Sequence, residues 1–292
     1  MTRRRSLKML MVACLSSTAI IPLWAGGASS QIDAMPSIPA VDLLRMANVA
    51  APPDGVSLRL HMDFPEDAPL VAGGLTIYSL TATVSPEGVS QVEHAATAQE
   101  TSAAAGGVDE CSDPAFTPSS SLWGAEDMPI KWRMHRRSFP RELDNYRTKR
   151  VIRKAHRVWP RAQTDCSTSD KVGFSFNYLG PSNRSVKYDG TNLVEFGELD
   201  GPLATNYTWY QGSEMLEVDL RLNKAYSWTP RYGGNRYNIQ NVVAHEIGHQ
   251  IGLEDLGDPH GALTMFARIF KGETSKLTLG RGDLKGAGFV SP

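Results

Sequence analysis

The stretch HEIGHQIGLED, residues 245–255, has two histidines four positions apart and a glutamate directly after the first. Apolar residues recur every fourth position through this region, which predicts a helix with one buried stripe; they are Ile239, Val243, Ile247 and Ile251. On such a helix His245 and His249 lie one turn apart on the same side, where two imidazoles can bind one metal ion at about 2.0–2.1 Å each. The competing interpretation is a helix whose histidines are exposed or hydrogen-bonded.

The residues after the second histidine predict a third metal ligand. Gly252 lies where the helix should end, because glycine accepts the left-handed conformation that turns a chain. This turn directs Asp255 back toward the histidines, and a carboxylate can bind zinc at about 2.0–2.2 Å. His260, five residues further on, is the alternative third ligand. Glu246 points beside the metal, where a general base can take a proton from a metal-activated water.

HEIGHQIGLED followed by LTMFA, residues 263–267, resembles the metzincin zinc peptidases, in particular their matrixin-like and snapalysin-like members. Their pattern is HExxHxxGxxH or HExxHxxGxxD and then a methionine turn. The resemblance extends from about residue 121 to the end of the sequence. It implies an α+β catalytic domain with a mixed twisted sheet, an active-site helix that carries HExxH, and a loop-rich C-terminal subdomain.

The resemblance also implies the roles of individual residues. One catalytic Zn²⁺ ion is expected on His245, His249 and Asp255. Glu246 is expected to act as the catalytic base. Met265 is expected in the turn below the metal.

Strand and helix candidates surround the motif. Residues 56–64, 74–84, 171–179 and 192–199 have strand composition, and 205–223 reads as two strands around a turn. Residues 141–161 have apolar positions at helical spacing. Within EMLEVDLRLN, residues 214–223, apolar and charged residues alternate, which predicts a half-buried strand. This strand is similar to the edge strand of matrixin-like peptidases, and that similarity implies pairing with an extended protein or peptide substrate.

Residues 1–28 have the layout of an export signal. A basic start precedes an apolar run over residues 9–25, and small residues follow. We expect a secreted, extracellular protein exported by a Sec or twin-arginine route, with no stable membrane insertion after signal removal. An uncleaved membrane anchor is the other interpretation.

Charge divides the remaining chain. Residues 29–110 contain 11 acidic and 2 basic residues, whereas residues 111–292 contain 20 acidic and 24 basic residues. This asymmetry predicts an acidic pro-segment over 29–110, ending in a linker at 95–107, on a catalytic domain over 111–292. The pro-segment would then be an intramolecular inhibitor; an independent acidic domain is the other interpretation. The overall charge of −1 gives no case for a nucleic-acid partner.

Two cysteines remain once a signal containing Cys14 is removed. A disulfide between Cys111 and Cys166 is the simple prediction for an exported protein. The alternative, suggested by the pro-segments of matrixins, is that Cys111 caps the zinc.

Together these features predict a secreted zinc-dependent endopeptidase that is made as a zymogen. The alternative is a catalytically weak or inactive zinc-binding homologue of the cell envelope that binds peptides. An acidic cluster would in addition permit a Ca²⁺ site; its members are Asp189, Asn192, Glu195, Glu198 and Asp200.

Overall fold

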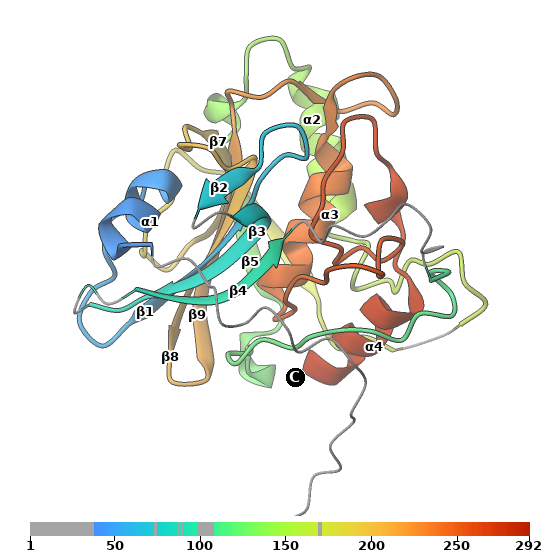
Figure 1. Cartoon of the computed structure of the whole chain (residues 1–292), viewed down its shortest axis with the longest axis horizontal. Helices are drawn as coiled ribbons and strands as arrows, with labels where there is room; N and C mark the ends of the chain where they lie inside the picture. The colour runs from blue at the N-terminus through green and yellow to red at the C-terminus, as the bar shows by residue number, and fades with distance from the viewer. Residues whose placement is uncertain (1–37, 73–74, 87, 89, 98–107, 169–170) are drawn as a thin grey trace, which may run out of the picture. The chain divides into compact units, whose positions relative to one another are not determined.

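In the computed structural model, segments on both sides of the predicted linker contribute strands to one mixed sheet (Figure 1). The structure describes residues 38–292 apart from 73–74, 87, 89, 98–107 and 169–170. The predicted export signal and most of the predicted linker therefore lie outside the described residues. The strands of the sheet are β1 (Ser57–Asp63), β2 (Leu70–Ala72), β3 (Leu75–Val84), β4 (Ser90–Thr97), β5 (Ile130–Met134), β6 (Phe176–Pro181), β7 (Asn192–Gly197), β8 (Ala204–Gln211) and β9 (Glu214–Asn223).

These nine strands of the described residues follow the order β2-β3-β1-β8-β9-β7-β5-β6, and β4 also pairs with β3. Two short strands form a separate parallel pair, β10 (Trp228–Thr229) and β11 (Tyr237–Asn238). The helices are α1 (Ala40–Ala47), α2 (Asn145–Ala155), α3 (Ile239–Gln250) and α4 (Arg281–Val290), with single 3-10 turns η2 (Ala125–Asp127), η3 (Arg136–Ser138) and η4 (Ser275–Leu277). The α+β prediction with a mixed sheet is confirmed. In the described ranges, none of the helices has the length and apolar character needed to cross a bilayer.

The expectation that residues 214–223 form the edge strand is wrong. Strand β9 pairs antiparallel with β8 on one side and parallel with β7 on the other, so its backbone groups are already engaged. Among β5 to β9 the two outer strands are β6 and β8, and β1 pairs antiparallel with β8 from Ser57↔Tyr210 to Asp63↔Ala204. The alternation in the sequence identified a strand, but alternation does not say which strand is its neighbour.

Strand β1 has two chemically different faces, as the period-2 geometry of a strand requires. Leu58, Leu60 and Met62 are fully buried in an apolar cluster that also includes residues of α1, β3 and β8. The residues that alternate with them, Arg59, His61 and Asp63, are buried on the opposite face. Strand β1 therefore joins an apolar core on one side to polar partners on the other.

A larger apolar cluster surrounds α3, which is buried along its whole length. The helix begins after Asn238, whose side chain accepts a hydrogen bond from the N–H of Asn241 at 3.0 Å. Helix α2 packs beside it and is capped in the same way by Asp144. Burial on all sides of α3 means that more of its surface is fixed by packing than the single apolar stripe indicated.

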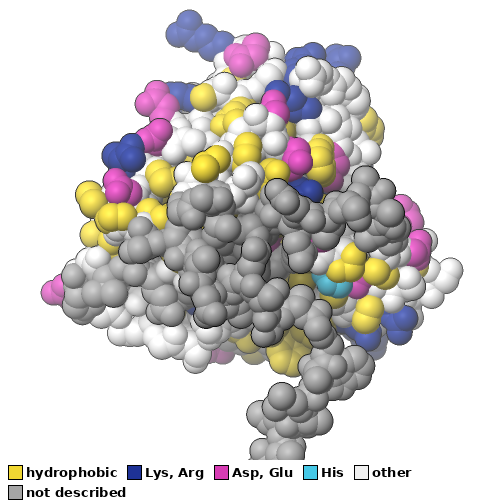
Figure 2. All heavy atoms as spheres, viewed as in Figure 1, with side chains coloured by type: hydrophobic (Ala, Val, Ile, Leu, Met, Phe, Trp, Pro, Cys, Tyr) yellow, Lys and Arg dark blue, Asp and Glu magenta, His cyan; other side chains and the backbone are white. Residues whose placement is uncertain are grey.

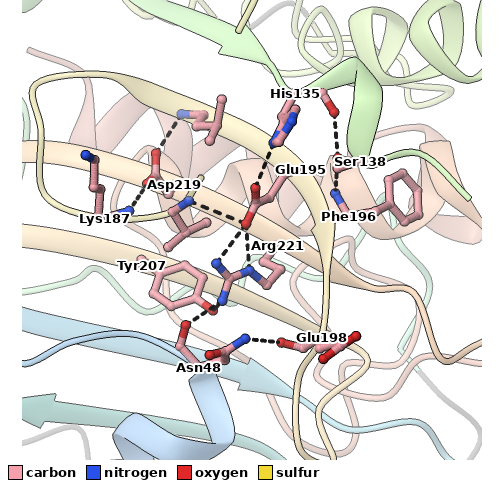
Figure 3. Close-up of polar contacts among 12 residues, drawn as sticks. Asn48, His135, Ser138, Lys187, Glu195, Phe196, Glu198, Tyr207, Asp219 and Arg221 are labelled. Carbon is pink, nitrogen blue, oxygen red and sulfur yellow. Dashed lines mark hydrogen bonds and ion pairs between the residues drawn. The ribbon is translucent and has the colours of Figure 1, made fainter. Parts of the chain in front are cut away.

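The segment before the linker is anchored to the sheet by a buried arginine (Figure 3). Arg221 on β9 donates to the backbone carbonyls of Ala47 at 3.1 Å and Asn48 at 2.7 Å. The same guanidinium pairs with Glu195 on β7 at 2.7 Å, and Tyr207 on β8 donates to the Ala47 carbonyl. A desolvated guanidinium thus satisfies its donors partly on the N-terminal segment.

Cys111 and Cys166 form a disulfide, which confirms that prediction over the zinc-capping alternative for Cys111. The bond closes a loop between residues 55 apart in sequence.

On the surface face shown in Figure 2, acidic and basic side chains of the described residues are interspersed.

Replacing both cysteines by serine should lower the free energy of unfolding by about 4 kcal/mol, because the unfolded chain regains the entropy of an open loop of this length. Urea unfolding of the parent and the Cys111→Ser/Cys166→Ser variant, both under oxidising conditions, measures the difference. Equal midpoints would contradict the prediction.

His156 should make stability depend on pH. Its ring stacks on Trp132 with centroids 3.5 Å apart, and its Nδ1–H donates to the Ile152 carbonyl. Burial lowers the pKa of His156 to about 3. In the unfolded state His156 binds a proton below about pH 6.5, whereas in the folded state it binds one only below about pH 3. The free energy of unfolding therefore falls by about 1.4 kcal/mol per pH unit as the pH decreases through this window.

His156→Phe keeps an aromatic ring on Trp132 and removes this proton. Urea unfolding at pH 7, 6 and 5 should show a shallower loss of stability in the variant than in the parent. Parallel pH profiles would contradict the assignment to His156.

Candidate metal centre

Helix α3 carries His245 and His249, whose Nε2 atoms face the same point and have no hydrogen-bond partner among the described residues. The Nδ1 atom of His245 lies 2.7 Å from the carbonyl of Thr264, and that of His249 lies 2.8 Å from the carbonyl of Leu253. Because a carbonyl only accepts, each Nδ1 carries the hydrogen and each Nε2 keeps its lone pair. This is the tautomer that a histidine needs to bind a metal through Nε2.

The chain reversal after α3 brings Asp255 to the same point. Gly252 follows the helix with a φ of +102°, a conformation that side chains other than glycine rarely adopt. Asp255 Oδ1 then lies 3.2 Å from His245 Nε2 and 3.6 Å from His249 Nε2. Its other oxygen accepts a hydrogen bond from Ser79 on β3. The sequence-predicted third residue therefore lies with the histidines.

His260, the alternative third ligand, lies outside this group. Its Nδ1 atom is 2.8 Å from a carboxylate oxygen of Asp113, and its side chain is 28% exposed. Glu254, next to Asp255, also points elsewhere and pairs with His61 at 2.9 Å. Burial alone would raise the pKa of Glu254, but the nearby His61 outweighs it and lowers the pKa to about 2.

A fourth donor comes from the N-terminal segment and was not predicted. Asp63, the last residue of β1, has Oδ2 3.2 Å from His245 Nε2. One ligand atom from each of Asp63, His245, His249 and Asp255 lies within 4.8 Å of the others. The available signal was the alternation in VSLRLHMDF, which gives Arg59, His61 and Asp63 one shared face. Nothing in that pattern names the residues it faces.

The four residues fit a cation. All are at most 1% exposed, and both Nε2 atoms, both Asp63 oxygens and Asp255 Oδ1 have no hydrogen-bond partner among the described residues. Buried charges and lone pairs that face one another without a proton or cation between them are costly. Nitrogen and carboxylate donors in this number suit zinc.

Glu246 lies beside this cluster, buried and also without a hydrogen-bond partner in the described residues. Burial raises the pKa of Glu246 well above its usual value, and the charge of Asp63 adds to this effect. The pKa values of the histidines diverge. Burial lowers that of His249 to about 4, whereas at His245 the charge of Asp63 outweighs burial and raises the pKa to about 10.

Met265 packs against α3 at Gly248, in a turn held by groups that the motif did not reveal. A Cβ at Gly248 would lie only 2.1 Å from Met265 Sδ, so the turn contacts α3 between the two histidines. The buried carboxylate of Asp283 accepts from the N–H groups of Thr264 at 2.8 Å and Met265 at 3.1 Å. The buried ammonium of Lys276 donates to the carbonyls of Thr264 and Phe266.

The acidic cluster considered for calcium is occupied by protein cations. Glu195 pairs with Arg221, and Asp189 pairs with Arg184 at 2.9 Å. Within the described ranges, two sets of side chains have ligand atoms close enough together to hold one metal ion. One is Asp63, His245, His249 and Asp255; the other is Glu110, Cys111 and Cys166, whose two sulfurs form the disulfide. Calcium binding at the predicted cluster is therefore unsupported.

Comparison with known proteins gives the family. A family model described as matrixin matches residues 122–288, more than half of the chain. Neutrophil collagenase from Homo sapiens is 25% identical over 180 residues, which is 62% of this chain and 35% of the collagenase. Interstitial collagenase from Sus scrofa is 23% identical over the same shares, and matrix metalloproteinase-20 from Homo sapiens is 30% identical over 93 residues, 31% of this chain and 19% of its own.

The chain spans about a third of the length of these two collagenases. The matched residues include the whole of α3, the chain reversal at Gly252 and the turn of Met265. The metzincin resemblance is thereby confirmed, and the protein belongs to the matrixin family.

Proposed function

We propose that this matrixin is a secreted zinc-dependent endopeptidase that is made as an inactive precursor. The observation that carries the proposal is the buried group of His245, His249 and Asp255, whose unpaired atoms converge beside Glu246. Secretion is proposed from the export-signal layout of residues 1–28, together with the disulfide, which is typical of exported proteins.

Zinc held by the two histidines and Asp255 would supply a Lewis acid that acidifies a water and polarises a peptide carbonyl. Glu246 would accept a proton from this water at a carboxylate oxygen and then give it to the leaving amine. A carboxylate whose pKa is raised by burial is a better proton acceptor near neutral pH than an ordinary one. The carbonyls of Thr264 and Leu253 would hold both imidazoles in the binding tautomer throughout.

The backbone of β8 is the proposed platform for the substrate, in place of β9. In the full chain β1 pairs antiparallel with the outer side of β8 and ends at the metal cluster. A peptide that took the place of β1 would gain the same backbone hydrogen bonds and would cross the cluster at the same point.

The N-terminal segment, residues 29–110, is the proposed intramolecular inhibitor. Its β1 strand occupies β8, and Arg59 on that strand donates to Ser119 at 2.7 Å and Ser121 at 2.8 Å. Its negative charge complements the positive charge of residues 111–292. An extended substrate and this segment cannot occupy β8 together.

Replacing the base tests the mechanism. In the processed protein Glu246→Gln should reduce casein or peptide hydrolysis by about 10²–10⁴-fold, because proton transfer by a positioned side chain contributes about that much. Zinc content should stay at the parent level. Glu254→Gln is the matched control: the side chain of this nearby glutamate is not part of the donor cluster, so the variant should retain most of the activity.

A Glu246→Gln variant as active as the parent would contradict the mechanism. A parent that binds zinc and peptides but hydrolyses none would favour the alternative of an inactive zinc-binding homologue.

Replacing the third ligand tests the metal assignment. Processed protein is required, since Asp63 would otherwise remain beside the site. Asp255→Ala should lose zinc on gel filtration in a chelator-containing buffer, whereas His260→Ala should keep one zinc per chain, measured by elemental analysis. Full retention in Asp255→Ala together with loss in His260→Ala would reverse the assignment.

A further inference from the structure

Strand β1 delivers one side chain to the metal cluster at a fixed position. The carbonyl of Asp63 accepts a hydrogen bond from the N–H of Leu203 at 2.7 Å, and Asp63 stands opposite Ala204 in the β1–β8 register. Ladder bonds along all of β1 set this register, and the apolar face formed by Leu58, Leu60 and Met62 prevents a one-residue slip. The carboxylate therefore points to the cluster as a consequence of strand pairing.

The neighbours of Asp63 on the same face extend this contact. The ring of His61 stacks on that of His249 with centroids 4.2 Å apart, and its Nε2 pairs with Glu254. Ser79 on the adjacent β3 donates to Asp255. Three side chains from two N-terminal strands thus touch the proposed ligands or the residue beside them.

The chemistry of Asp63 indicates what it binds. Its carboxylate is fully buried, and neither oxygen has a hydrogen-bond partner among the described residues. It faces the lone pair of His245 Nε2 at 3.2 Å, because the hydrogen of that ring is on Nδ1. Two electron-rich atoms at this distance need a proton or a cation between them, and the convergence of four such donors at one point suits a metal ion. No described thiol is free for that task, since both described cysteines are in the disulfide.

We propose that Asp63 is the fourth donor to the zinc in the uncleaved chain and occupies the position that the reacting water needs. This inference rests on the proposed zinc site and names the group that keeps the precursor inactive. The inhibitory strand and the inhibitory ligand are then one element. Withdrawal of β1 opens the β8 edge and the coordination position in a single event.

The test uses the full-length chain with Glu246→Gln in every protein, which prevents self-processing. Asp63→Ala and the near-isosteric Asp63→Asn should each lower zinc affinity by about tenfold or more. Even the loss of a residue that only hydrogen-bonds to a metal ligand lowers metal affinity by about 10–100-fold. Competition with a chelator of known affinity measures this loss. Asp67→Asn is the matched control: Asp67 ties the same segment to Tyr237 at 2.6 Å and to Lys271 but does not touch the cluster.

A second measurement reports the coordination position directly. With Co²⁺ in place of zinc, acetohydroxamate, a small bidentate ligand, should leave the visible spectrum of the parent and of Asp67→Asn unchanged. It should alter the spectrum of both Asp63 variants, in which the position is free. Thermal unfolding of each protein checks that the segment remains folded.

Zinc affinity and cobalt spectra in the Asp63 variants that match those of the parent would overturn the inference, even if the processed enzyme hydrolyses peptides. A drop in affinity in these variants, without any peptide hydrolysis by a processed protein that retains Glu246, would support the inference and contradict the peptidase proposal. A loss of affinity as large in Asp67→Asn would also overturn it, because docking of the segment alone would then account for the effect.

Discussion

Unpaired charge around one buried point constrains the rest of this molecule. Two imidazole lone pairs and three carboxylates meet where no water reaches; the groups are His245, His249, Asp63, Asp255 and Glu246. A dry interior tolerates such a set only when a cation or bound protons offset the charge. One helix can direct only two of these donors at one point, a turn apart, so the others must come from a tight chain reversal and from a separate strand.

The orientation of the two rings depends on residues far from the helix. His245 is held by the carbonyl of Thr264, and the backbone of Thr264 is in turn fixed by the carboxylate of Asp283 at the start of α4. Burial raises the pKa of Asp283 even though three N–H groups bind its carboxylate. The C-terminal helix thereby contributes to the site through backbone positions, without approaching the cluster itself.

Local patterns predicted those parts of the structure that depend on local interactions. Helix α3, the hairpin of β8 and β9, and the convergence of Asp255 with the histidines all arise within short stretches of sequence. The neighbour of β9 was predicted wrongly, because alternation looks the same in an edge strand and an inner strand. Asp63 was missed for a related reason. The sequence of β1 shows which residues share one face, but long-range strand pairing decides which residues that face contacts. Asp283 and Lys276 contact backbone N–H and carbonyl groups, which every residue carries, so their partners cannot be recognised from a sequence motif.

The pairing of β1 with β8 has a consequence for the processed protein. Tyr207 and Trp209 on β8 are almost fully buried by the apolar cluster that α1, β1 and β3 provide. Loss of the N-terminal segment would expose these aromatic rings together with a row of unpaired backbone groups. Such an edge associates readily with any extended chain, including another copy of itself. The segment would then act as an intramolecular chaperone that covers the aggregation-prone edge of β8 while the domain folds.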